Sequence, residues 1–254
     1  MRFTLVAMLT LLLTGCSSAP MPDKVVERAQ THLEAGRSYQ GAWMAWRAAR
    51  TGNWKAQRLM TRIYSQSDSI YLDYKNLGWA RYWERQLVAA QQEAARAGDV
   101  AAMAELGVRY MPGQAMWFNE EPLVEKDRGR ATELLKKAAA QGSGQAHAML
   151  AHPHLFERPT TERMELLRKA AELGYAEAHR MMASWMYHPA RESEHASVVE
   201  YVRALRKGTM AGDGVAGQTL EEFVEGLQRA ATDGNAMSTE VLDTLAQAGL
   251  QIPS

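Results

Sequence analysis

The sequence predicts an all-α protein, an α/α solenoid of antiparallel helix pairs. Ala, Leu, Met, Glu, Arg and Gln, which favour helices, are abundant, whereas only 8 prolines and 4 phenylalanines occur in 254 residues. Strand signals are nearly absent. In addition, one glycine-centred segment recurs five times along the chain. Recurrence of this kind is the sequence signature of a repeat architecture.

The N-terminal residues have the features of a signal peptide. Arg2 precedes an apolar run of eleven residues, Phe3 to Leu13, and two small residues then precede Cys16. Eleven apolar residues fall well short of the roughly 20 that a helix needs to cross a bilayer, so we expect a cleaved leader and not a membrane span. The alternative is an ordinary secretory leader that ends near a cysteine by chance.

The segment Leu13-Thr14-Gly15-Cys16 resembles a lipobox, the cleavage site of bacterial lipoprotein signal peptidase. The resemblance implies that residues 1–15 are removed and that Cys16 becomes the first residue and carries fatty acyl chains such as palmitate. Residues 16–23 then form the lipidated N-terminus and a polar, proline-bearing tether. An aspartate after the lipidated cysteine favours retention in the inner membrane, and this chain has Ser17 there. The resemblance therefore implies the periplasmic face of the outer membrane.

Composition excludes several other functions. Loss of the leader leaves 28 basic and 29 acidic residues, so no electrostatic case exists for nucleic acid as a partner. A hydrophobic content of 46% argues against disorder. Cys16 is the only cysteine, so the fold cannot depend on disulfides. No later segment is long and apolar enough to span a bilayer, and we expect membrane contact through the lipid anchor only.

The repeated segment joins two helices through a glycine. An alanine stands four residues after each of these glycines, Met or Leu stands eight after, and Ala or Gly stands four before. Such a glycine ends one helix in the left-handed conformation. Asn, Asp or Ser follows it in four segments and can cap the next helix, whereas Tyr175 breaks this rule. The small residues let the two helices approach closely. The predicted turn glycines are Gly52, Gly98, Gly142, Gly174 and Gly212.

These turns define the expected domain organisation. We expect an N-terminal capping helix at 24–37, five degenerate helix pairs at 38–225 and C-terminal capping helices at 226–254. The glycines lie 46, 44, 32 and 38 residues apart, and two insertions, at 65–77 and 114–126, account for the longer spacings. A sixth partial match surrounds Gly234, only 22 residues after Gly212, which is too short for two full helices.

The middle of the chain resembles the Sel-one-like repeat (SLR) family, a relative of the tetratricopeptide repeat. The resemblance covers roughly residues 38–225 and implies a right-handed superhelix whose concave face and loops bind other proteins. Many members staple each repeat with paired cysteines, which this chain lacks, so packing alone must hold its repeats. The residues that carry the resemblance are Leu106, Gly107, Tyr110, Gly113, Asp127, Ala131, the run Leu135 to Gly142, Ala146 and Leu150.

Catalytic and metal-binding patterns are weak. His147 and His152 are five residues apart, which is not one helix face, and Pro153 separates His152 from His154. Ser143 fits a capping role better than that of a nucleophile. We therefore expect no enzymatic activity, no metal and no cofactor.

Aromatic residues around the two insertions are the candidate partner contacts, because Trp and Tyr are enriched at the energetic centres of protein interfaces. Trp79 and Trp83 are four residues apart, so packing into the core is an equal alternative for them. We expect Trp43, Trp46 and Trp54 in the core. The candidate contacts are Tyr71, Tyr74, Trp79, Trp83, Trp117, Phe118 and the acidic Glu120.

Two functions remain open. The first is a non-catalytic adaptor that holds another protein of the cell envelope. The second is a periplasmic immunity protein that neutralises a lipase-type toxin delivered by rival bacteria, which small size and irregular repeats also fit.

Overall fold

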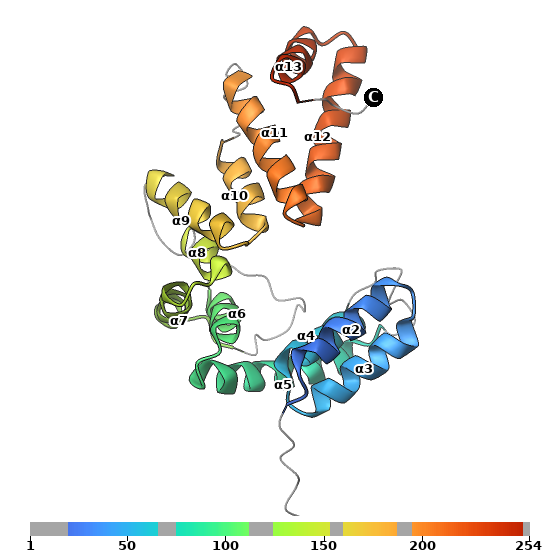
Figure 1. Ribbon diagram of the computed structural model, residues 1–254, viewed down its shortest axis with the longest axis vertical. Coiled ribbons are helices and arrows are strands. Elements are labelled where there is room, and N and C mark those ends of the chain that lie inside the picture. The colour runs from blue at the N-terminus through green and yellow to red at the C-terminus, as the bar shows by residue number, and fades with distance from the viewer. Residues whose placement is uncertain (1–19, 66–74, 112–123, 153–159, 187–194, 251–254) are drawn as a thin grey trace, which may run out of the picture. The chain divides into compact units, whose positions relative to one another are not determined.

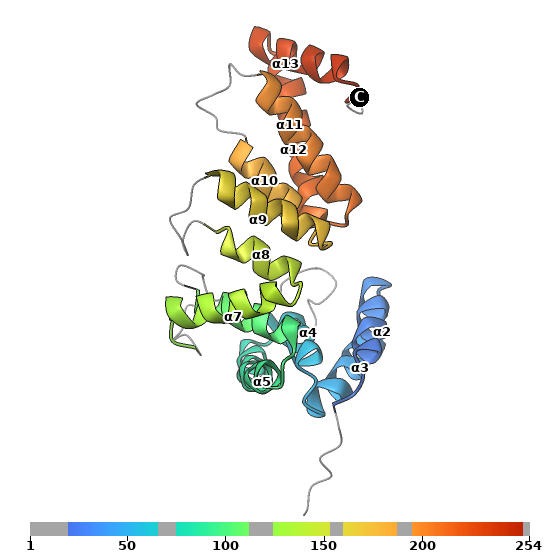
Figure 2. The same ribbon diagram turned by 60° about the vertical axis from the view of Figure 1, so that its left-hand side comes forward.

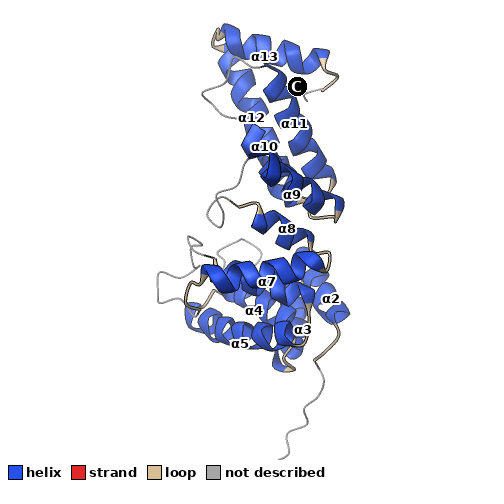
Figure 3. Cartoon of the chain, turned by 90° about the vertical axis from the view of Figure 1, so that its left-hand side faces the viewer, coloured by secondary structure: helices blue, strands red, loops and turns tan. Residues whose placement is uncertain are grey.

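The computed structural model describes residues 20–65, 75–111, 124–152, 160–186 and 195–250, and these residues contain twelve α-helices and no strand (Figures 1 and 3). The predicted all-α class is confirmed for this part of the chain. The chain divides into two compact units, Met1–Ala97 with Ala115–Val124 and Gly98–Gln114 with Glu125–Ser254. Cys16, Tyr71, Tyr74, Trp117, Phe118 and Glu120 lie outside the described residues.

The first unit holds four helices, each of which packs on the next in sequence (Figure 1). They are α2 (Asp23–Glu34), α3 (Ser38–Arg50), α4 (Trp54–Ser65) and α5 (Leu77–Arg96). Leu33, Met60, Ile63 and Trp83 lie in their shared core with a set of small alanines. The predicted capping helix at 24–37 corresponds to α2, which ends with Gly36 in the left-handed conformation.

The second unit holds eight helices that also pack in chain order (Figure 2). They are α6 (Val100–Tyr110), α7 (Arg128–Ala140), α8 (Gly144–Leu150), α9 (Thr160–Glu172), α10 (Glu177–Met186), α11 (His195–Met210), α12 (Gly214–Thr232) and α13 (Ala236–Gln247). The predicted start of the C-terminal cap, residue 226, lies inside α12. Gly234 leads from α12 to the single helix α13.

All five predicted turn glycines have positive φ, between 82° and 96°. At Gly142 the glycine amide donates to the Ala139 carbonyl at 2.9 Å, and the Ser143 amide donates to the Ala138 carbonyl at 3.0 Å. This pair of bonds is the Schellman motif. It recurs at Gly174 and Gly212. At these three turns the carbonyl that closes the turn belongs to the small residue four positions before the glycine.

The predicted helix caps form at the four turns where a capping residue follows the glycine. Asn53, Asp99 and Ser143 each accept a hydrogen bond from the backbone amide three residues later, at 2.9 to 3.1 Å. Asp213 accepts from two amides, those of Val215 and Ala216. At the fourth turn the Tyr175 side chain instead donates its hydroxyl proton to Glu177 Oε2 at 2.6 Å. A side-chain acceptor for the first amides is thus supplied wherever the sequence predicts one.

Small residues bring the helices of the second unit close together. A Cβ added at Gly107 in α6 would stand 2.8 Å from Leu135 Cγ in α7, and one added at Gly144 would stand 2.9 Å from the Ala170 carbonyl oxygen. The alanines four residues after the turns are fully buried: Ala56, Ala102, Ala146, Ala178 and Ala216. Close contact between helix backbones thus takes the place of the cysteine staples.

Substitution of Gly142 by alanine should lower the free energy of unfolding by about 1–2 kcal/mol, because its φ of 85° is costly for an L-residue. Nothing lies within 4 Å of the added Cβ, so the cost is one of backbone conformation. Gly226→Ala is the matched control. It also adds a Cβ in open space, but inside helix α12, and should raise the free energy of unfolding by about 0.5–1 kcal/mol. Denaturant unfolding measures both, and a Gly142→Ala protein as stable as wild type would contradict the turn.

Candidate protein-binding surface

Three large apolar side chains are exposed at the start of α5. Leu77, Trp79 and Tyr82 keep 55%, 52% and 43% of their surface in contact with solvent. We call these three residues the α5 aromatic surface. An exposed group of large apolar residues is uncommon on a monomeric protein and marks sites of interaction.

The start of α5 is held in place by Asn76. Its side chain caps the helix, since Oδ1 accepts the Trp79 amide proton at 3.0 Å. Its own backbone amide donates to the Tyr64 carbonyl at 2.9 Å, which ties the end of α4 to the start of α5. Trp79 therefore lies in a first helical turn of α5 that Asn76 caps and also ties to the end of α4.

The exposed rings belong to a continuous aromatic ladder. Tyr64 and Trp79 stack at 6.3 Å, Trp79 and Tyr82 meet edge to face at 5.5 Å, and Tyr82 and Trp83 do the same at 5.1 Å. Each such pair contributes about 0.5–1.5 kcal/mol beyond the area that it buries. The ladder runs from the surface at Trp79 to the core at Trp83. The exposed rings are thereby ordered before any partner binds.

The structure corrects two of the sequence-based assignments. Trp83, a predicted partner contact, is only 3% exposed and packs with Ile63 in the core, so it supports the surface from behind. Trp43, expected in the core, is 50% exposed. Trp54 is buried as expected, and Trp79 lies at the surface. Tyr82 completes the exposed set.

A charged groove of about 550 Å³ lies between α9, α10 and α11 in the second unit. It is lined by residues of both signs, and Arg203 pairs with Glu200 at 2.7 Å. Burial, and to a lesser extent the charge of Lys207, lowers the pKa of His179. The groove therefore places His179 among charged side chains of both signs.

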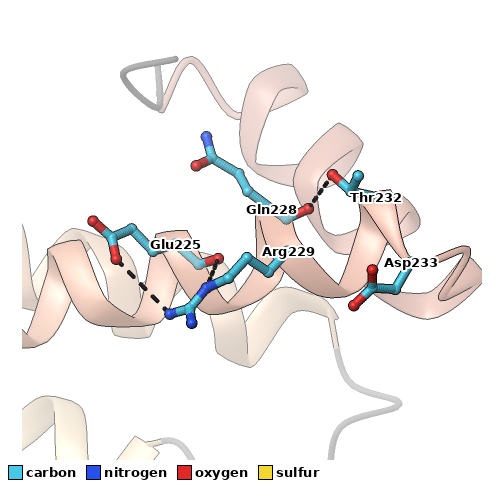
Figure 4. A pocket seen from close by; sticks show the side chains of 5 residues that line it. All are labelled: Glu225, Gln228, Arg229, Thr232 and Asp233. Atoms are coloured by element: carbon cyan, nitrogen blue, oxygen red, sulfur yellow. Dashed lines mark hydrogen bonds and ion pairs between the residues drawn. The ribbon is translucent and has the colours of Figure 1, made fainter.

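The recess in Figure 4 lies along a single helix, α12. Arg229 and Glu225 form an ion pair at 3.8 Å, and the Thr232 hydroxyl donates to the Gln228 carbonyl at 2.8 Å. Both contacts join residues four apart on one helix, as is ordinary for a helix surface. The recess therefore shows no convergent chemistry.

The described residues hold neither a metal-ligand cluster nor a membrane-spanning helix. In those ranges, no three His, Cys, Asp or Glu residues come together as a metal site would require. Likewise, none of the described helices is both long and apolar enough to cross a bilayer. His147 Nδ1 lies 2.9 Å from the Ser143 carbonyl oxygen, within its own helix.

No family model and no curated protein matches the chain. Solved structures that are similar to it include the following two. A Sel1 repeat protein from Oxalobacter formigenes shares 18% identity over 88% of this chain and 84% of that one, with a TM-score of 0.46. A protective antigen present in uropathogenic Escherichia coli strains, which displays an SLR fold, shares 18% identity over 87% of this chain and 57% of its own, with a TM-score of 0.41. By its own helices and turns, the described chain is an α/α repeat protein, and it is similar to Sel1-type (SLR) proteins.

Proposed function

We propose that the mature protein is a non-catalytic protein-binding scaffold, held by a lipid on Cys16 at the periplasmic face of the outer membrane. The observation that carries the binding role is the α5 aromatic surface. Its three side chains stand in solvent although the same helix buries Leu87 and Trp83. A partner that covers them removes apolar surface from water, at about 25 cal/mol per Å².

Order in the aromatic ladder favours tight contact with a protein. Association costs conformational entropy, about 0.5–1.5 kcal/mol for each flexible side chain that becomes immobile. Trp79 already stacks on Tyr64 and meets Tyr82 edge to face, so part of this cost is met during folding. Trp and Tyr held in this way are typical of the residues that dominate interface energies.

Two features of the sequence support the anchor and the location. The apolar leader ends at Leu13-Thr14-Gly15-Cys16, and Cys16 is the only thiol in the chain. A protein anchored in this way needs no transmembrane helix, because several acyl chains together bind a bilayer stably. Ser17 favours the outer membrane over the inner one.

Truncation of Trp79 and of Trp83 should separate binding from folding. Trp83→Ala empties a core position and should lower the free energy of unfolding by about 3–5 kcal/mol. Trp79→Ala removes a half-exposed ring with two ring contacts and should cost less, about 1–3 kcal/mol. Denaturant unfolding followed by far-ultraviolet circular dichroism compares them. Equal costs at the two positions would contradict the assignment of Trp79 to the surface.

A photo-reactive amino acid in place of Trp79 should form a discrete covalent adduct with a protein in living cells. The matched control is the same amino acid in place of Glu225, which is exposed on α12. Electrophoresis and mass spectrometry then identify the adduct. A resident envelope protein supports the adaptor, and a toxin delivered by another cell supports the immunity protein.

The surface must also behave as one unit in this experiment. Tyr82→Ala, which removes the ring packed against Trp79, should reduce the adduct several-fold without loss of the helical signal. An adduct pattern at position 79 that is the same as at position 225 would contradict a binding role for the α5 aromatic surface.

A further inference from the structure

A second exposed aromatic face lies on α3, and it carries positive charge. Its residues recur at intervals of three or four, which places them on one side of the helix. Tyr39 is 75% exposed and Trp43 is 50% exposed. We call this face the α3 stripe, and its members are Tyr39, Trp43, Trp46, Arg47 and Arg50. The opposite face of α3 is buried through Gly41, Ala45, Ala48 and Ala49.

The stripe has a defined geometry. The rings of Trp43 and Trp46 stack at 5.1 Å with an angle of 16° between their planes. The guanidinium carbon of Arg50 lies 4.8 Å from the centre of the Trp46 ring, a cation–π contact. All of the stripe except Tyr39 lines a depression of about 380 Å³ with Met21 and Thr51, and Trp46 is half-buried against the core there. Flat aromatic rings and guanidinium groups thus share one face.

The charged residues of the stripe, Arg47 and Arg50, are both positive, whereas the acidic residues nearby in the chain, Asp23 among them, belong to α2. α3 and α4, residues Ser38–Arg50 and Trp54–Ser65, contain five basic residues and no acidic one, whereas the whole chain has 29 of each sign. Lys55 is paired at 2.5 Å with Asp23 of α2, and this contact lowers the pKa of Asp23. Arg47 and Arg50 are exposed on the stripe itself. The complementary partner is therefore anionic.

The N-terminal tether leaves the folded unit beside this stripe. The Met21 amide donates to Thr51 Oγ1 at 2.9 Å, and Asn53 Nδ2 donates to the Met21 carbonyl at 2.7 Å. Asn53 Nδ2 also contacts Asp23 Oδ1 at 3.0 Å. Asn53 is buried, with 6% of its surface exposed, and its two bonds to the tether are partly buried. Met21 is fixed where it lines the same depression as Trp43.

The distance from the anchor to the stripe is short. Cys16 and Met21 are five residues apart, and an extended chain covers at most about 3.6 Å per residue, so a lipid on Cys16 lies within roughly 18 Å of Met21. The closeness of the stripe to a membrane rests on the lipid anchor proposed above. Given that anchor, the stripe is held next to the bilayer that the lipid enters.

We propose that the α3 stripe docks on an anionic phospholipid bilayer, as a second membrane contact beside the lipid of Cys16. Tryptophan and tyrosine rings prefer the level of the lipid headgroups. Basic residues near an anionic bilayer are attracted to its surface charge. Trp43 inserts at the headgroup level, Trp46 supports it from the core side, and Arg47 and Arg50 bind the phosphates. The sequence alone predicts contact through the lipid only.

The test uses the whole mature chain with Cys16→Ser, so that no acyl chain contributes to binding. It should sediment with vesicles that contain 30% phosphatidylglycerol and not with vesicles of phosphatidylcholine alone. Trp43→Ala with Arg50→Gln should weaken this binding about tenfold or more, and Arg47→Gln with Arg50→Gln should also weaken it. The control is Lys207→Gln with Met210→Ala, a basic and an apolar residue exposed on α11, which should bind as the parent does.

Circular dichroism and thermal unfolding confirm that each variant is folded. Binding to both kinds of vesicle alike, binding that survives loss of the stripe, or no binding at all would overturn the proposal. So would a discrete protein adduct, in place of lipid, from a photo-reactive amino acid at position 43 in cells. Labelling of Cys16 with palmitate and the adduct at position 79 report on the anchor and the scaffold role independently of these vesicles.

Discussion

The backbone hydrogen bond that closes a glycine turn is the contact on which three of the five repeat turns depend. At Gly142, Gly174 and Gly212, the amide after the glycine donates to the carbonyl four residues before it, and only the left-handed glycine conformation permits this bond. The turn fixes where one helix ends and the next begins. The fully buried alanines then set how closely the helices pack. Because the described helices are joined and packed in this way, the repeats form without cysteine pairs.

Local chemistry made the turns, caps and buried alanines predictable from the sequence. Exposure of the tryptophans depends on which helix face meets its neighbours, and spacing alone left that open. A usable signal was nevertheless present in α3, where the small residues Gly41, Ala45 and Ala48 already define a face for close helix contact. Trp43 falls outside that face and is exposed, although it was expected in the core. Trp83 lies one turn from Leu87 and shares its burial.

The first unit couples the N-terminal tether to two exposed aromatic faces. Asn53 joins the tether to α4, because its side chain caps α4 and also donates to the Met21 carbonyl. α4 packs against α3, which precedes it in the chain, and against α5, which follows it. The α3 stripe is rich in arginine, whereas the α5 aromatic surface is formed by Leu77, Trp79 and Tyr82. The α3 stripe next to the tether suits a lipid headgroup, and the ordered rings of the α5 aromatic surface suit a protein.

The function proposed for this chain is a binding surface whose position is set by Cys16, and lipidation is therefore its central claim. The mass of the N-terminal peptide from protein purified out of its native envelope tests it most directly. The expected result is a peptide that begins at Cys16 and carries a diacylglyceryl group and an amide-linked acyl chain. A peptide that begins elsewhere, or an unmodified Cys16, would contradict the anchor and the placement of both faces near a membrane.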